Sequence, residues 1–145
     1  MSKKRKTKKE ISIPKLKDKV WKVFSEYIRR KYARWDDTCQ CYTCGVVKPW
    51  KEMQAGHGFG GRTNMIIFDE KITRPQCFQC NVRMHGNYDL FHARLENEYG
   101  YGIIQEYNKL KYQEKSFTRE ELYKIMEQYK EKIELLKNKN LTTDM

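Results

Sequence analysis

The chain has 145 residues and a formal net charge of +11 at pH 7, and it has no apolar segment long enough to cross a bilayer. Hydrophobic residues make up 39% of it and charged residues 34%, which predicts one domain whose small core needs a metal or disulfide staple. The charge favours nucleic acid over membrane as a partner, although it is also compatible with a role in solubility alone.

The first 14 residues are expected to form a basic flexible arm. Lys3, Lys4 and Arg5 in this arm are candidates for contacts with DNA phosphates, although a solvated tail or a localisation signal has the same composition. No apolar run follows the basic start, so no export signal is expected and the protein is placed in the cytoplasm. In a reducing compartment, paired cysteines indicate metal or redox chemistry rather than disulfides.

The rest of the chain predicts an α+β fold. Apolar residues recur at helical spacing over 15–34, and Pro14 fits the start of that N-terminal helix. The segment 35–102 combines glycine, proline and cysteine with short β-prone runs such as 65–68, and a helical pattern follows over 88–99. Helices are also expected within 103–145, where Thr118 and Glu121 form a capping box before an amphipathic stripe that packs on the domain or on a second copy.

Four cysteines have the spacing of zinc knuckles. The pairs Cys41-x-x-Cys44 and Cys77-x-x-Cys80 each present two thiolates, and together they predict one structural Zn²⁺ site. A thioredoxin-like redox pair is the rival, but neither knuckle has a βαβ context. Cys39 is interpreted as a spare thiol. The 32 residues of 45–76 between the knuckles exceed the usual spacing of roughly 15–20, so a folded insertion is expected there.

His57 lies within this insertion, in the sequence AGHGFGGR, whose small residues let a bulky ligand approach the backbone. Asn81 directly follows the last zinc cysteine, and His85 comes four residues later. If a helix starts at Cys80, this spacing places Asn81 and His85 on one face, where they could hold a divalent cation against a phosphate. A lone histidine is by default a scaffold residue, and these neighbours favour a catalytic role.

The order CxxC, AGH, CxxCN resembles the His-Me finger (HNH, or ββα-metal) nucleases, including the phage resolvase endonuclease VII. The stretch QAGHGFGGRTNMIIFDEKITRPQCFQCNVRMHGNYDLFHARLENEYG is most similar to the NinG/Rap recombination endonucleases of lambdoid phages, over roughly residues 37–102. This resemblance implies a zinc-stapled ββα-metal core, at 35–102, with flanking N- and C-terminal helices. It also implies a phage protein that acts in the host cytoplasm.

The resemblance implies a role for each matched residue. His57 would be the general base, Asn81 and His85 ligands of a catalytic Mg²⁺ or Mn²⁺, and the four paired cysteines the ligands of structural Zn²⁺. Many relatives place an aspartate or histidine directly before the base, where this chain has Gly56. The missing ligand is then expected from His85, Gln54, Asp69 or the substrate.

The implied activity is hydrolysis of branched recombination intermediates, such as Holliday junctions and D-loops, to 5′-phosphate and 3′-hydroxyl ends. Two opposed cuts call for a homodimer. Arg62, Arg74 and Arg83 flank the site as candidates for DNA contacts, and Trp35 and Trp50 are candidates for stacking on opened bases. Two alternatives remain open at this point. One is a non-catalytic zinc-ribbon or treble-clef DNA-binding protein, and the other is an architectural protein that binds a partner through its last helix.

Overall fold

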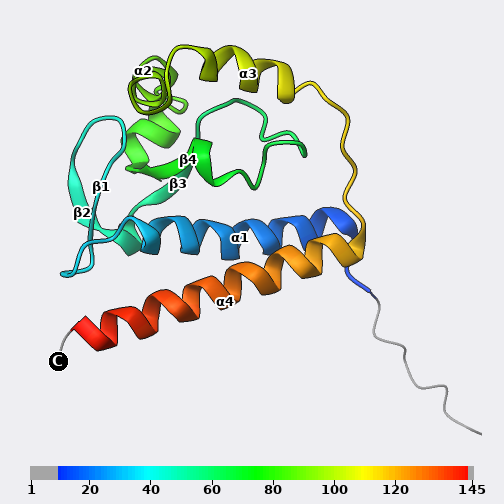
Figure 1. Ribbon diagram of the computed structural model, residues 1–145, viewed down its shortest axis with the longest axis horizontal. Coiled ribbons are helices and arrows are strands. Elements are labelled where there is room, and N and C mark those ends of the chain that lie inside the picture. The colour runs from blue at the N-terminus through cyan, green and yellow to red at the C-terminus, as the bar shows by residue number, and fades with distance from the viewer. Residues whose placement is uncertain (1–9, 144–145) are drawn as a thin grey trace, which may run out of the picture.

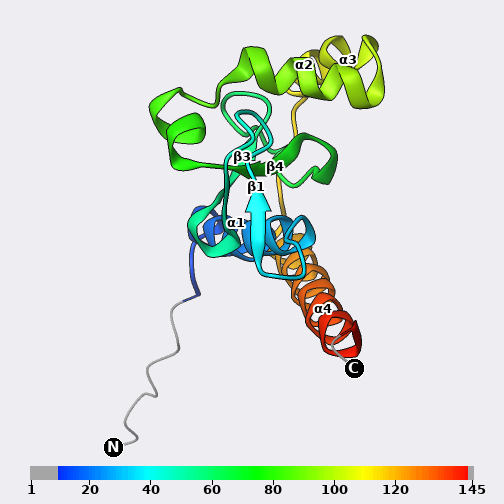
Figure 2. The same cartoon turned by 90° about the vertical axis from the view of Figure 1, so that its left-hand side faces the viewer.

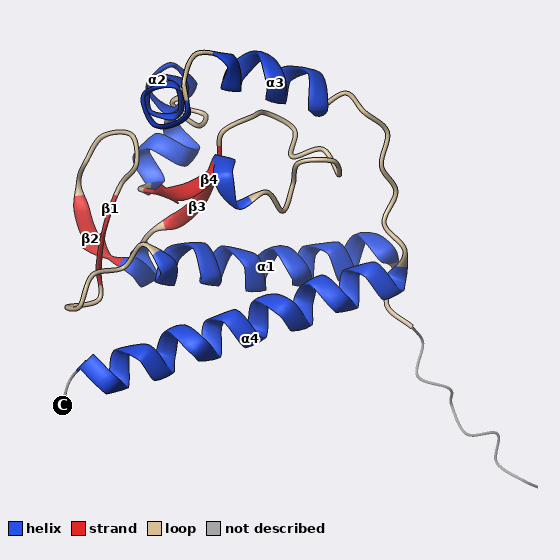
Figure 3. Cartoon of the chain, in the orientation of Figure 1, coloured by secondary structure: helices blue, strands red, loops and turns tan. Residues whose placement is uncertain are grey.

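The computed structural model describes the backbone of residues 10–143 and the side chains of residues 10–139 (Figure 1). It combines helices with two small antiparallel sheets, which confirms the mixed class expected from the sequence (Figure 3). The elements in chain order are α1 (Ile13–Lys31), β1 (Thr38–Gln40), β2 (Val47–Pro49), the 3-10 turn η1 (Trp50–Glu52), β3 (Gln54–His57), the 3-10 turn η2 (Glu70–Ile72), β4 (Thr73–Gln76), the short π-helix η3 (Gln79–Arg83), α2 (Tyr88–Tyr99), α3 (Gly102–Leu110) and α4 (Arg119–Thr143).

The β3–β4 sheet lies between two layers of helices. Figures 1 and 2 both place α1 and α4 on one side of these strands and α2 and α3 on the other. The strands are antiparallel, and their register pairs Gly56 with Arg74 and His57 with Thr73. The separate β1–β2 hairpin carries the first cysteine knuckle at its turn. His57 is the last residue of β3 and therefore lies between the two layers of helices.

Helices α1 and α4 pack side by side and run in the same direction. Leu16 and Val20 near the start of α1 share a buried cluster with Leu122 near the start of α4. Further toward the C-terminal ends of both helices, the Phe24 and Tyr129 rings meet edge to face with centroids 4.9 Å apart. The first turn of α1 contains Pro14, as the sequence predicts, and the Ser12 side chain caps it by accepting from the Lys15 amide. The predicted cap of α4 is also present, because the Thr118 hydroxyl accepts a hydrogen bond from the Glu121 amide.

The long loop 58–72 between β3 and β4 is held by its own core. Phe59, Ile66 and Ile72 from the loop and η2 are buried against Phe91 and Leu95 of α2. The prediction of β structure at 65–68 is wrong, because the Ile66 and Ile67 amides both donate to the Thr63 carbonyl and close a turn there. The apolar residues of that run fill the core from a turn and not from a strand.

Among the helices formed by residues 10–143, none is long and apolar enough to span a membrane.

Candidate active site and metal centre

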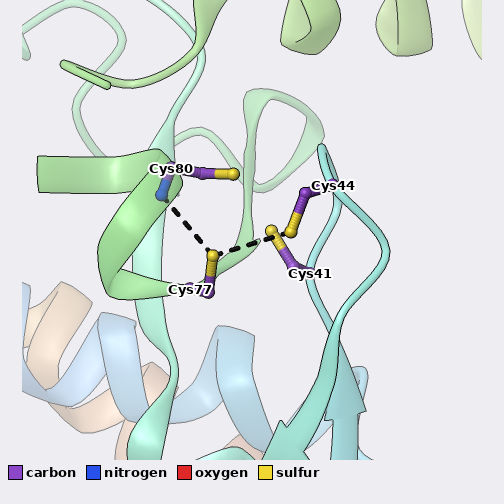
Figure 4. Close-up of side chains that lie close together, drawn as sticks. All are labelled: Cys41, Cys44, Cys77 and Cys80. Carbon is purple, nitrogen blue, oxygen red and sulfur yellow. Dashed lines mark hydrogen bonds between the residues drawn. The ribbon is translucent and has the colours of Figure 1, made fainter. Parts of the chain in front are cut away.

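The four paired cysteines converge on one point. Their Sγ atoms all lie within 4.8 Å of one another, and the Cys44 and Cys77 sulfurs are 3.7 Å apart (Figure 4). Four sulfurs at about 2.3 Å from a tetrahedral Zn²⁺ would be about 3.8 Å apart, so the cluster has the size that this ion requires. The donor set therefore fits zinc, and the four cysteines close the coordination shell without a water.

The surroundings of the cluster suit thiolates. Burial alone would raise the pKa of Cys41, but hydrogen bonds from the Thr43 hydroxyl and nearby backbone amides lower it to about 6. Burial and the neighbouring sulfurs raise the pKa of Cys44 to about 12. Crowded thiols cannot all ionise without a cation between them, and a metal ion supplies that charge.

Two further N–H groups point at sulfurs of the second knuckle. The Cys80 amide lies 3.5 Å from the Cys77 Sγ, and the Asn87 side-chain amide lies 3.6 Å from the Cys80 Sγ. Cys39 is fully buried beside the cluster, and burial raises its pKa to about 11. A thiol that stays protonated is a poor ligand, which agrees with its interpretation as a spare cysteine.

His57 lies in a pocket of about 650 Å³ that opens along the outer edge of β3. Asn81 from η3 and Gln54 from β3 line the same pocket, and the Asn81 Nδ2 donates to the Gln54 Oε1 at 2.6 Å. The fold thus brings His57, at the end of β3, into one pocket with Asn81 of η3, although the two residues are far apart in the sequence. No aspartate or glutamate lines this pocket among the described residues.

The His57 ring is buried and in contact with the backbone on both sides. Its Nε2 lies 3.0 Å from the Ile66 carbonyl oxygen, and its Nδ1 lies 2.9 Å from the carbonyl oxygen and 3.3 Å from the amide nitrogen of Phe59. Burial lowers the pKa of His57, although both carbonyls oppose that shift. In the neutral ring with the proton on Nε2, the Nδ1 lone pair accepts the long hydrogen bond from the Phe59 amide and also faces the Phe59 carbonyl oxygen at 2.9 Å.

Gly56 is required by the packing of the neighbouring strand. A Cβ built on Gly56 would lie 1.9 Å from the Oε1 of Gln76, which is fully buried on β4. The Gln76 Nε2 donates to the Thr43 hydroxyl and to the Gly86 carbonyl, so its amide is fixed in place. The position before His57 cannot carry a metal ligand unless Gln76 moves.

The other proposed metal ligands lie away from this pocket. The short helix η3, which contains Cys80, ends at Arg83. His85 beyond it has a left-handed backbone (φ 51°), is exposed and does not line the pocket. The shared helical face that the spacing of Asn81 and His85 predicted is therefore absent. Asp69 accepts hydrogen bonds from the Lys71 amide and the Tyr107 hydroxyl and also lies outside the pocket. Of the three protein alternatives, Gln54 is the one that the fold brings to Asn81.

The predicted arginines and tryptophans have different positions. Arg62 lines the His57 pocket and lies over the Trp21 ring at 4.6 Å. Arg74 is only 4% exposed and is paired with Glu98 at 3.0 Å, and Arg83 is exposed outside the pocket. Trp50 is buried beneath Arg30, so it cannot stack on a base. Trp35 is 94% exposed, whereas Lys3, Lys4 and Arg5 lie outside the described residues.

Helix α1 contributes to the pocket in a way that was not predicted from the sequence. Trp21, Ser25 and Arg29 all line it, and each follows the previous one by four residues. That spacing places them on one face of a helix, which was the available signal. Burial lowers the pKa of Arg29, whose Nε donates to the Ser25 carbonyl. The pocket therefore has two guanidinium groups, from Arg29 and Arg62.

The chain was compared with protein families, with curated proteins and with solved structures. No curated protein and no solved structure matches the chain. The family model described as Bacteriophage Lambda NinG protein matches residues 1–139, which is nearly the whole chain. The cysteine cluster, the β3–β4 hairpin and the pocket residues all lie within that match, and the chain belongs to the NinG family.

Proposed function

We propose that this protein is a metal-dependent endonuclease with a His-Me finger core that cuts branched DNA formed during phage recombination in the host cytoplasm. The observation that carries the proposal is the pocket in which His57, at the end of a hairpin strand, meets Asn81, on the helix after the hairpin. Two arginines beside them and a net charge of +11 suit a phosphodiester substrate.

In this proposal His57 is the general base. The Ile66 carbonyl orients the ring by accepting a hydrogen bond from the Nε2–H, which leaves the Nδ1 lone pair to accept a proton from the attacking water. The water has to replace the 3.3 Å hydrogen bond from the Phe59 amide, and that bond is long enough to be weak. Because burial lowers its pKa, His57 is neutral and able to accept a proton at neutral pH.

Asn81 and Gln54 are the residues that would hold Mg²⁺ or Mn²⁺. Their amide oxygens are hard donors, as these ions prefer, but they are few and uncharged, and their mutual hydrogen bond has to rearrange for both oxygens to bind. The metal ion supplies positive charge against the negative charge that develops on the phosphate and the leaving 3′-oxygen. Arg29 and Arg62 would bind the phosphates that flank the scissile bond and orient them.

The substrate completes this sparse shell in our proposal. Mg²⁺ in proteins commonly keeps waters and binds substrate phosphates together with one or two protein groups. Metal binding should therefore be weak in the free protein and strengthen when DNA is bound. Two opposed cuts in a four-way junction would need two such pockets, so a homodimer is part of the proposal.

The decisive experiment compares His57→Ala with His85→Ala on a synthetic four-way junction in Mg²⁺ or Mn²⁺. Loss of a general base lowers the rate by about 10²–10⁴-fold, and junction binding and zinc content should stay unchanged. The exposed His85 lies outside the pocket, so His85→Ala should cleave at nearly the wild-type rate. Cleavage lost only in His85→Ala would contradict the assignment of the base and support His85 as a ligand.

A non-catalytic DNA-binding protein is the second candidate. It is favoured by the hydrogen-bond partners of His57, since a histidine with a purely structural role would also have both ring nitrogens beside backbone groups. Wild-type protein that binds junctions but cuts no branched or duplex DNA in any divalent metal would establish this candidate instead.

A further inference from the structure

A second pocket, of about 430 Å³, lies at the other edge of the β3–β4 sheet. The sheet residues that line it, Arg74 and Pro75, come from β4, whereas those of the His57 pocket come from β3. The first cysteine knuckle borders it, because the Tyr42 amide donates to the Pro75 carbonyl. The two pockets therefore open on opposite sides of the hairpin.

Three arginines meet in this second pocket. Arg34 comes from the turn after α1, Arg74 from β4 and Arg94 from α2, so the fold gathers them from distant parts of the sequence. Arg74 is buried and already paired, with donors directed at Glu98 and the Tyr99 hydroxyl. Glu98 balances the charge of Arg74, so that Arg34 and Arg94 are, among the described residues, the arginines of this pocket without a carboxylate partner.

The two exposed arginines keep donors available for a ligand. Arg94 uses its Nε and Nη2 to donate to the Tyr42 and Thr43 carbonyls at 3.1 Å each, which fixes the guanidinium and leaves its Nη1 free of these bonds. Arg34 has one long contact, at 3.5 Å, to the Gln40 Oε1. The nearby Asp36 carboxylate is already engaged by the amide and hydroxyl of Thr38. Among residues 10–139, neither Arg34 nor Arg94 forms an ion pair.

We infer that this pocket binds a backbone phosphate of a second DNA segment, other than the segment that enters the His57 pocket. The fixed guanidinium group of Arg94 and the exposed one of Arg34, both with N–H donors to spare, match the oxygens of a phosphodiester. A straight duplex that lies along the β3 edge faces away from the β4 edge, whereas a branched DNA sends strands in diverging directions from one point. The pocket would thus help to distinguish branched from linear DNA. The inference rests on the proposed function in taking branched DNA as the partner and the His57 pocket as the site of its first segment, but it does not depend on cleavage.

Arg34→Gln is the sharpest test, because Arg34 is exposed and supports no buried group. Binding to a four-way junction and to a linear duplex is measured without added divalent metal, so that nothing is cut and no chelator removes zinc. A lost bond to a charged phosphate should weaken junction binding by at least about tenfold. The slope of log affinity against log salt should fall by about 0.9, and duplex affinity should stay within about twofold.

Lys15→Gln is the matched control, since it removes one exposed charge at the opposite end of α1. It should weaken junction binding much less than Arg34→Gln does. Arg34→Lys, which keeps the charge but loses the planar fork, should fall between Arg34→Gln and the wild type. Zinc content and thermal unfolding, measured on each variant, check that the fold is intact.

Three outcomes would overturn the inference. These are unchanged junction binding in Arg34→Gln, an equal loss on junction and duplex, and saturable binding of inorganic phosphate that Arg34→Gln removes, which would assign the pocket to a free phosphate. The proposed function fails separately. Junction binding without cleavage by the wild type contradicts the nuclease and leaves this inference standing, whereas no DNA binding at all contradicts both.

Discussion

The cysteine cluster and the His57 pocket are built on opposite plans. The cluster brings four identical ligands within 4.8 Å, and its N–H···S contacts come from the protein itself. The pocket offers a metal ion only amide oxygens, from Gln54 and Asn81, and two arginines line it beside them. A structural site is complete before any partner arrives, whereas a site for a charged substrate keeps part of its coordination open for that substrate.

Breaking the complete site should have the largest effect. Cys77→Ser removes one thiolate, so the protein should lose its zinc and unfold, because a structural zinc site contributes on the order of 10 kcal/mol in small peptides. Elemental analysis and circular dichroism measure both results. Cys39→Ala is the control, since Cys39 is buried outside the four-sulfur cluster and should leave about one zinc per chain. A folded Cys77→Ser protein with its zinc retained would mean that the cluster is not the staple of the fold.

The packing between the two sites is the next point to break. Gly56→Ala places a methyl group where the Gln76 amide lies, and overpacking of a core costs typically about 1–3 kcal/mol. The displaced amide also holds Thr43 of the first knuckle and the Gly86 carbonyl, so junction cleavage should fall as well. Urea denaturation measures the loss of stability.

A double-mutant cycle assigns that cost to one contact. In the Gln76→Ala background the added methyl group has room, so Gly56→Ala should cost less there than in the wild type. An equal cost in both backgrounds would place the strain of Gly56→Ala elsewhere in the hairpin.

The open site can be sharpened by adding the charge that it lacks. Asn81→Asp replaces an amide oxygen with a carboxylate and should tighten Mn²⁺ binding in the absence of DNA by roughly tenfold. Calorimetric titration measures it, with Asn97→Asp, an exposed change on α2, as the control. If Asn97→Asp tightens binding as much, the gain comes from net charge and Asn81 is not a ligand.

The smallest effect concerns pH. The pKa of buried His57 lies below its ordinary value of about 6.5, so folding favours the neutral ring. Its contribution to stability is therefore present above that value and is lost as the pH falls through the lower pKa of the folded state. Between about pH 7.5 and 5.5 the wild type should lose unfolding free energy faster than His57→Gln does.

Chemical denaturation of both proteins with excess zinc measures this difference, because cysteine protonation then affects them alike. His85→Gln, a change at an exposed histidine, should follow the wild-type pH dependence. Identical curves for the wild type and His57→Gln would show that the His57 ring is solvated in the folded protein.

The parts of this structure that the sequence predicted are those with local signals. The periodicity of α1, the capping residue Thr118 and the spacing of the cysteine pairs each depend on residues close together in the chain. Because two knuckles have to meet around one ion, their spacing also predicted a long-range contact. The spacing of the knuckles also placed His57 in the folded insertion between them, and Asn81 directly after the second one.

The features that the sequence did not predict depend on backbone geometry and on packing between segments that are distant in the chain. The short helix η3 around Cys80 has π-helical geometry, and the chain then reverses through left-handed residues at 85–87. The α-helical spacing that would have placed Asn81 and His85 on one face therefore does not apply. Arg74 is of the residue type that contacts phosphate, but its guanidinium group is paired with the carboxylate of Glu98, 24 residues later in the chain. The spacing of Trp21, Ser25 and Arg29 indicates a shared helical face, but it does not reveal that this face lies beside His57.

The pairing of α1 with α4 has a consequence for synthesis of the chain. The apolar face of α1, with Phe24, Tyr27 and Ile28, packs against Tyr129 and Ile133 of α4, which leaves the ribosome long after α1 does. At translation rates of roughly 5–20 residues per second, this apolar face of α1 would stay exposed for several seconds before α4 is synthesised and can bury it. A nascent chain halted before α4 would present a sticky surface to chaperones, even after the knuckles had captured their metal.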